Sequence, residues 1–217
     1  MPFDDVLFGT ENYLSIRHKI RKLFMDQTAA KLTLLATEAA ACRGCRLSAT
    51  RSNVVFADGN FRSPLFLLGE APGREEDLQG VPFVGRSGKL LDRLLTEETG
   101  ITRSNYYIAN IIKCRPPDNR NPLPDEVDAC RHFLTDQISL VSPKVILALG
   151  NFAAKTLLQS PDGITKLRGN VFDIDVAGVS YKVVPTFHPS YVLRAGAVAM
   201  AQMRSDLVRA KRLLSSQ

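Results

Sequence analysis

Three side chains suited to binding a base or a reacting water lie close to the ends of apolar runs. Glu70, Asn110 and His188 stand at or just after the ends of these runs, which cover residues 65–69, 106–112 and 181–186. A carboxylate can orient water, an amide can donate and accept hydrogen bonds, and an imidazole can donate to a developing negative charge. If the runs are parallel strands, their ends meet at one edge of a sheet. A single ligand site is therefore predicted there, although each group alone is more often structural.

The segment GEAPGREEDLQGVPFVG, residues 69–85, follows the first apolar run. Its glycines let a ligand approach the backbone closely. It is also acidic, with Glu70, Glu75, Glu76 and Asp77 inside a chain whose net charge is +6. This loop is the predicted cradle of the ligand site.

Four cysteines form a second chemical group. Cys42 and Cys45 make a Cys-x2-Cys pair, and Cys114 and Cys130 follow with fifteen residues between them. No export signal is visible, which disfavours disulfides. Four thiolates suit zinc or an iron–sulfur cluster, and their spacing leaves the choice open. Such a site need only tie the chain segments together.

Apolar strands alternate with amphipathic helices along the chain. This pattern predicts a parallel sheet covered by helices on both faces. The expected strands are 65–69, 106–112, 144–149 and 181–186, with a hairpin around Gly178; the expected helices are one or two over 12–41, then 86–98, one from about 124, 151–158 and 197–214.

The bulk properties limit the class of protein. The 217 residues suffice for one well-buried core, and no apolar run is long enough to span a membrane. The acidic residues near the N-terminus fit neither a secretory signal nor a transit peptide, so we expect a cytoplasmic protein. The net charge of +6 favours a polyanionic partner such as nucleic acid, although many basic proteins bind none.

Four blocks of the sequence carry a family resemblance. In order and spacing, the blocks resemble the iron–sulfur uracil-DNA glycosylases of bacteria and archaea, known as family 4. They read GEAPGREEDLQGVPFVGRSGKLLDRLL, YYIANIIKCRPPDNRNPLPDEVDAC, VILALGNFAAKTLL and FHPSYVLR. The similarity begins at about Cys42, so we expect residues 1–41 to be an N-terminal helical extension and 42–217 to be the glycosylase domain.

The resemblance implies a fold, a cofactor and an activity. The fold is α/β, with three α/β/α layers around a central four-stranded parallel sheet. The implied cofactor is a [4Fe-4S] cluster held by Cys42, Cys45, Cys114 and Cys130. The implied enzyme flips uracil out of single- or double-stranded DNA and hydrolyses its N-glycosidic bond, which starts base excision repair. A monomer is expected, with a protein partner for the extension.

The chemistry then assigns roles in the pocket. Phe83 is expected to stack on the uracil, Asn110 to bind its O4 and N3–H edge, and His188 to donate to O2. The implied catalytic residues are Glu70, Asn110 and His188, and the implied substrate-binding residues are Gly69, Ala71, Pro72, Glu76 and Phe83.

Ala71 marks a departure from the best-known branch of the superfamily, where an Asp in this loop aligns the attacking water. Glu70 is the neighbouring carboxylate that can take that role, or it can serve as a structural acceptor for backbone N–H groups. The resemblance places Glu76 against uracil C5, where it would exclude the thymine methyl group. The alternative for Glu76 is a solvated loop acid.

The segment after His188 is the predicted DNA contact. It resembles a loop that inserts an apolar wedge into the duplex beside a phosphate-binding cation. The implied DNA-binding residues are Pro189, Ser190, Tyr191, Val192 and Arg194. The stiff basic segment 115–120 is a further candidate for contact with the DNA backbone.

Two other functions compete with a glycosylase. One is a non-catalytic iron–sulfur module that binds DNA and docks a replication protein. The other is a protein that traps uracil-DNA covalently through a loop histidine, which the loop CRPPDNRNP lacks. A phosphate-binding NTPase is disfavoured, because Lys89 in GRSGKLL is followed by Leu90 rather than Ser or Thr.

Overall fold

A computed structural model describes residues 10–215, and its centre is a six-stranded sheet in the order β1-β3-β2-β4-β6-β5. The strands are β1 (Asp58–Gly59), β2 (Leu65–Gly69), β3 (Tyr107–Asn110), β4 (Val145–Leu149), β5 (Phe172–Val176) and β6 (Val179–Thr186). The four middle strands are parallel, as predicted, and β1 and β5 pair antiparallel at the edges. The predicted four strands are therefore the centre of a larger sheet. β5 is the first arm of the hairpin expected around Gly178.

The sheet is buried on both faces because its central strands are apolar throughout. Every residue of β2, β3 and β4 is buried. Gly69 of β2 pairs with Asn110 of β3, and Leu149 of β4 pairs with Thr186 of β6. These registers bring the carboxyl ends of the parallel strands to one edge, where the ligand site was expected.

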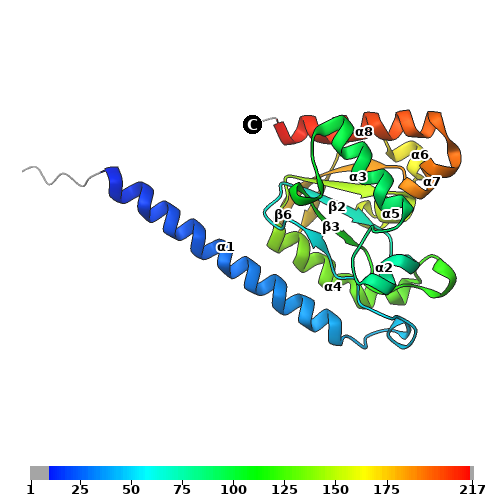
Figure 1. Cartoon of the computed structure of the whole chain (residues 1–217), viewed down its shortest axis with the longest axis horizontal. Coiled ribbons are helices and arrows are strands. Elements are labelled where there is room, and N and C mark those ends of the chain that lie inside the picture. The colour runs from blue at the N-terminus through cyan, green and yellow to red at the C-terminus, as the bar shows by residue number, and fades with distance from the viewer. Residues whose placement is uncertain (1–9, 216–217) are drawn as a thin grey trace, which may run out of the picture.

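Helices cover the two faces in separate groups (Figure 1). Their bounds are α1 (Thr10–Ala41), α2 (Arg74–Gln79), α3 (Arg86–Thr99), α4 (Pro124–Val141), α5 (Asn151–Leu158), α6 (Ile164–Leu167), α7 (Pro189–Ala195) and α8 (Ala197–Ser215), with 3-10 turns at Arg46–Ala49, Arg103–Asn105 and Pro117–Asn119. α3, α7 and α8 share one core cluster, and α4, α5 and the end of α1 share the other. The three-layer α/β/α architecture is thus confirmed.

The short helices α2, α6 and α7 border the ligand site and were not expected. α2 begins within the acidic loop, and α7 occupies residues predicted as an inserting loop. α7 has a local cause: Pro189 stands in its first turn, and the His188 side chain accepts a hydrogen bond from the Ser190 backbone N–H as the N-cap.

The expected N-terminal helices form one continuous helix, α1, which projects away from the sheet (Figure 1). Leu32, Leu35 and Ala39 near its end are buried in the core cluster that includes α4. Four apolar side chains farther along the projecting part are exposed: Ile16, Ile20, Leu23 and Phe24. Residues 1–9 of the expected extension lie outside the described residues. Within residues 10–215, no helix is long and apolar enough to cross a membrane.

Candidate active site and cysteine site

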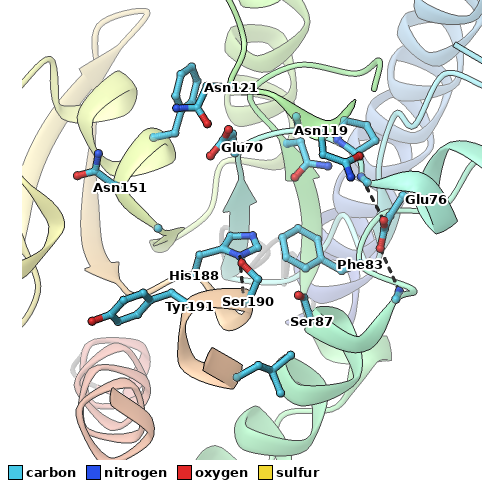
Figure 2. A pocket seen from close by; sticks show the side chains of 18 of the residues that line it. Glu70, Glu76, Phe83, Ser87, Asn119, Asn121, Asn151, His188, Ser190 and Tyr191 are labelled. Atoms are coloured by element: carbon cyan, nitrogen blue, oxygen red, sulfur yellow. Dashed lines mark hydrogen bonds between the residues drawn. The ribbon is translucent and has the colours of Figure 1, made fainter. Parts of the chain in front are cut away.

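The three groups predicted at strand ends line one pocket. Glu70 lies after β2, Asn110 ends β3, and His188 lies between β6 and α7. Figure 2 shows Glu70, Phe83 and His188 around the space beyond the end of β2. The first residues of α3 and α5 also line this pocket, so two helix N-termini with their positive dipole ends border it. The side chains of Arg74, Arg86, Arg120 and Arg194 add positive charge at its wall.

The Asn110 amide is buried and incompletely bonded. Its side-chain oxygen, Oδ1, has no hydrogen-bond partner within the described residues. A Cβ added at Gly69 would lie 2.3 Å from this oxygen and 2.5 Å from Cζ of Phe83, so only glycine fits beneath the two side chains. A buried acceptor without a donor costs free energy, and a ligand N–H would satisfy it.

Phe83 is held in an uncommon backbone conformation. Its φ is +57°, and its ring centroid lies 6.0 Å from that of His188 with the planes tilted by 36°. A non-glycine residue in the left-handed region costs about 1–3 kcal/mol, and such strain is frequent where a side chain must be aimed at a ligand. The ring forms part of the pocket wall next to the imidazole.

Glu76 anchors the loop that carries Phe83. One carboxylate oxygen accepts from the N–H groups of Val84 and Gly85, both at 3.0 Å, and the other accepts from the Gly73 N–H at 3.1 Å. These bonds join the start of α2 to the start of α3. Both oxygens are engaged by the backbone, so the side chain is not a solvated loop acid. Glu76 also lines the pocket, and its place against uracil C5 stays a prediction.

His188 presents one ring nitrogen to the protein. The backbone N–H of Ser190 donates to Nδ1 at 3.2 Å, and the Ser190 hydroxyl lies 2.8 Å from the same atom. Since a backbone N–H can only donate, Nδ1 carries no proton, and the neutral ring carries its proton on Nε2. Burial, helped by the charge of Arg194, lowers the pKa of His188 to about 4. At neutral pH the ring is therefore an uncharged donor.

Glu70 is another acidic side chain of this loop that lines the pocket, and it lacks the backbone hydrogen bonds that Glu76 accepts. No hydrogen bond or ion pair to the Glu70 carboxylate occurs within the described residues, and burial raises its pKa. The alternative of a backbone anchor, considered for Glu70, is the role that Glu76 fills. Ala71 beside it lines the pocket as a small apolar surface, and Pro72 is buried behind it.

Some side chains of α7 are exposed to solvent, and others are buried in the core. Tyr191, Leu193 and Arg194 are exposed, whereas Pro189 and Val192 are buried. Val192 packs in the core cluster that includes α3 and α8. The prediction that Val192 contacts DNA is corrected, because the helical turn directs position 192 inward.

Sequence reasoning missed amide side chains at the rim of the pocket. Asn119 and Asn121 line the pocket opposite His188, with Asn121 beside Glu70 in Figure 2. They lie in the loop between the last two cysteines, which was read only as a DNA contact. Asp118 and Asn119 both have positive φ, and a 2.6 Å ion pair joins Arg120 to the buried Glu126 and fixes the loop. The turn formers in PPDNRNP were the available signal.

The four cysteines meet as expected. Cys42, Cys45, Cys114 and Cys130 line one small cavity between the end of α1 and the start of α4. Their sulfurs receive N–H donors: Arg51 to Cys114 at 3.1 Å, and the backbone of Lys113 to Cys130 at 3.4 Å. No group of three or more potential ligands suited to a single metal ion is found in residues 10–215. Four clustered thiols with N–H donors fit a thiolate-bound cluster.

Comparison with known proteins identifies the family. A family model described as the Uracil DNA glycosylase superfamily matches residues 56–210. A type-4 uracil-DNA glycosylase from Thermotoga maritima is 46% identical over 178 residues, which cover 81% of this chain and 91% of the relative. The chain belongs to the type-4 uracil-DNA glycosylases.

Two archaeal members of the type-4 family extend the comparison. The protein from Saccharolobus solfataricus is 38% identical over 190 residues, covering 86% of this chain and 88% of its own. The protein from Archaeoglobus fulgidus is 41% identical over 163 residues, covering 73% of this chain and 81% of its own. The family resemblance predicted from the four sequence blocks is thereby confirmed.

Proposed function

We propose that this type-4 family member is a monofunctional uracil-DNA glycosylase that flips uracil from DNA and hydrolyses its N-glycosidic bond, the first step of base excision repair. The observation that carries this proposal is the buried Asn110 Oδ1 without a donor, beside Phe83 and His188. An acceptor in that position matches the N3–H of uracil, and the ring of Phe83 matches the face of a flipped base.

The leaving group sets the role of His188. When the C1′–N1 bond breaks, its electron pair goes to uracil, and negative charge develops on O2. A neutral imidazole with its proton on Nε2 donates to that oxygen, while Ser190 holds Nδ1. The low pKa of His188 keeps the ring neutral, so Nδ1 stays an acceptor for Ser190 while the Nε2–H is the donor to the substrate.

Water must then add to C1′ of the cationic sugar. Glu70 is the carboxylate that supports this step: it orients the water, or its charge stabilises the sugar cation, and the water proton passes to it or to solvent. Its carboxylate is available for either role because it is not engaged by backbone N–H groups. Asn119 and Asn121 lie at the same rim and supply further hydrogen-bonding groups for the water or the sugar.

DNA contacts are assigned to the surface around the pocket. Tyr191 and Leu193 are the exposed apolar groups of α7, so we assign the apolar wedge to them. Arg194 and Ser190 remain candidates for phosphate contact, and the helix N-termini of α3 and α5 add to the attraction for anions.

A [4Fe-4S] cluster is the proposed cofactor of the cysteine site. The supporting observations are the shared cavity and the N–H donors to the sulfurs. When bound, the cluster would tie α1, the end of β3 and α4 together, and we assign it no step in the reaction. Anaerobically purified protein is expected to contain about four iron atoms per chain. Stoichiometric zinc without iron in iron-replete cultures would contradict this proposal.

The oligomeric state, the cellular location and the role of the N-terminal extension are also proposals. We expect a monomer in the cytoplasm of a bacterium or archaeon, where its DNA substrate lies, with residues 1–41 as an extension from a domain over 42–217. The exposed Ile16, Ile20, Leu23 and Phe24 support a protein contact through α1.

One assay separates a glycosylase from the competing functions. The full chain is incubated with a labelled oligonucleotide that contains a single uracil, and the products are resolved with and without alkali. We expect strand cleavage after alkali, no cleavage of the matched thymine oligonucleotide, and near-complete loss with Asn110→Ala. Binding without cleavage would support the non-catalytic module, and a complex that survives denaturing electrophoresis would support the covalent trap.

A further inference from the structure

A fully buried lysine lies between the two sites of the molecule. The Lys113 side chain is 1% exposed, and its ammonium makes no ion pair within the described residues. Burial of an amine is costly unless it is hydrogen-bonded, so a lysine that served packing alone would be better replaced by an apolar residue. Its contacts therefore indicate what it does.

The Lys113 amine donates two short hydrogen bonds. One goes to the main-chain carbonyl of Asn110 at 2.7 Å, and the other goes to Oε1 of Gln137 at 2.6 Å. The Phe56 ring, with its centroid 5.9 Å away, offers its face to the third proton. Gln137 is itself fixed, because its Nε2 donates to the Phe56 carbonyl and to the Tyr107 hydroxyl, each at 3.2 Å. The amine is thus held by a buried network.

The contact with Asn110 falls at the last residue of β3. The N–H groups of Ile111 and Ile112 still bond the carbonyls of Gly69 and Glu70. The chain then turns toward the cysteines, and the Lys113 amine folds back on the carbonyl of the residue that bears the recognition amide. This bond adds a side-chain restraint on the main chain at Asn110 to the bonds that the sheet supplies.

We propose that Lys113 is a positioning residue for uracil recognition: its buried amine fixes the main chain at Asn110 and so sets where the Asn110 amide meets the base. This inference rests on the proposed function. The backbone N–H of Lys113 also donates to Cys130, so the same residue joins the cysteine site to the recognition strand.

A double-mutant cycle tests the inference, with single-turnover excision as the measurement. Lys113→Met keeps the length of the side chain and removes the donors. We expect excision to slow by about tenfold to a hundredfold in the Asn110 protein, but by less than about threefold in an Asn110→Ala background. Equal losses in the two backgrounds, or no loss in the first, would overturn the inference.

A second readout separates positioning from general damage. DNA with a tetrahydrofuran abasic analogue presents no base to Asn110, so Lys113→Met is expected to bind it within about twofold of wild type. A parallel loss of this affinity would count against positioning. Iron content and melting temperature are measured in the same samples. Lys182→Met, which removes an exposed lysine paired with Asp173, is the matched control and is expected to behave as wild type.

If Lys113→Met does not fold, Gln137→Met provides the test. It removes one acceptor of the amine and leaves the bond to Asn110, so we expect a smaller loss, about threefold to tenfold, that disappears with Asn110→Ala. A loss that persists in that background, or none at all, overturns the inference. Wild-type excision together with its loss in Asn110→Ala checks the proposed function separately, so either can fail alone.

Discussion

Two carboxylates in the segment that follows β2 have opposite surroundings. Glu76 accepts hydrogen bonds from three backbone N–H groups, whereas the Glu70 carboxylate has no bonded partner within the described residues. Glu76 therefore fixes the loop, whereas Glu70 is available to a substrate or a water molecule. Side chains that are fully bonded inside the protein stabilise it, and those left unbonded beside a pocket are the ones that act on a ligand.

Among the pocket side chains with a polar atom that lacks a hydrogen bond, Asn110 is expected to give the largest effect on excision. Asn110→Ala is expected to slow single-turnover excision by about 10³-fold, because it removes the group that we propose recognises the base edge. The melting temperature is expected to stay the same or rise, since the mutation also removes a buried acceptor without a donor. Rates near wild type would remove Asn110 from the pocket's chemistry.

His188 belongs to both classes, because Nδ1 is bonded to Ser190 and Nε2 faces the pocket. His188→Ala is expected to raise the barrier by about 2–4 kcal/mol, the scale of one oxyanion donor. Because the folded pKa is about 4 and lies below the unfolded value, the ring's contribution to stability is present above about pH 6.5 and is lost as the pH falls through about 4.

The pH dependence of unfolding checks this assignment. Chemical denaturation of wild type and His188→Asn between pH 4 and 7 is expected to show a shallower dependence in the variant. Identical slopes for the two proteins would mean that the imidazole is not buried as an uncharged group.

Glu76 is the loop carboxylate whose two oxygens both accept backbone hydrogen bonds. Glu76→Gln is expected to lower the free energy of unfolding by about 1–3 kcal/mol, because an amide keeps one acceptor oxygen and turns an NH₂ group toward a backbone N–H. Urea denaturation measures the loss. Excision is expected to fall as well, since Phe83 follows the loop. Unchanged stability would show that the carboxylate bonds contribute nothing.

Glu70→Gln is expected to have the smallest effect and the opposite sign on stability. Excision is expected to slow by about tenfold with DNA affinity unchanged, because the proposed role of the carboxylate is exerted mainly in the transition state. Since burial raises the folded pKa of Glu70, its stabilising contribution is present below about pH 4.5 and is lost as pH rises through the folded value. The amide is therefore expected to stabilise the protein at pH 7.

The acid limb of the rate profile completes this test. The limb is expected to lie above pH 4.5 in wild type and to shift toward the lower pKa of His188 in Glu70→Gln. A variant with full activity and an unchanged profile would leave Glu70 as part of the pocket wall only.

The sheet and the strand-end groups were predictable, because uniformly apolar runs and the parallel-strand rule determine them. Asn151–Leu158 matched its expected helix at both ends. The direction of a side chain on a short helix was not predictable: once residues 189–195 form α7, Val192 turns inward and Leu193 outward. Periodicity is weak over so few residues.

The roles of the two loop carboxylates were also beyond the sequence. The sequence shows two acidic loop residues, with Glu70 as the candidate to align water and Glu76 placed against uracil C5 by the resemblance. The difference in their hydrogen bonding arises from backbone amides brought close by the turn before α3. Lys113 gave no sequence signal for burial, because lysine between a strand and a cysteine is usually exposed. The hydrogen bond from Lys113 to Gln137 joins the end of β3 to α4. Patterns of neighbouring residues in the sequence do not reveal a contact over this distance along the chain.

The order of the strands has a consequence for synthesis of the chain. β2 lies between β3 and β4, and His188 arrives only with β6, at the far side of β4. At ordinary translation rates, about 4–16 s separate the emergence of Asn110 from that of His188. During that interval a nascent chain carries the amide proposed to select the base but not the imidazole proposed to help it leave. On this proposal, base excision becomes possible only once the sheet is complete.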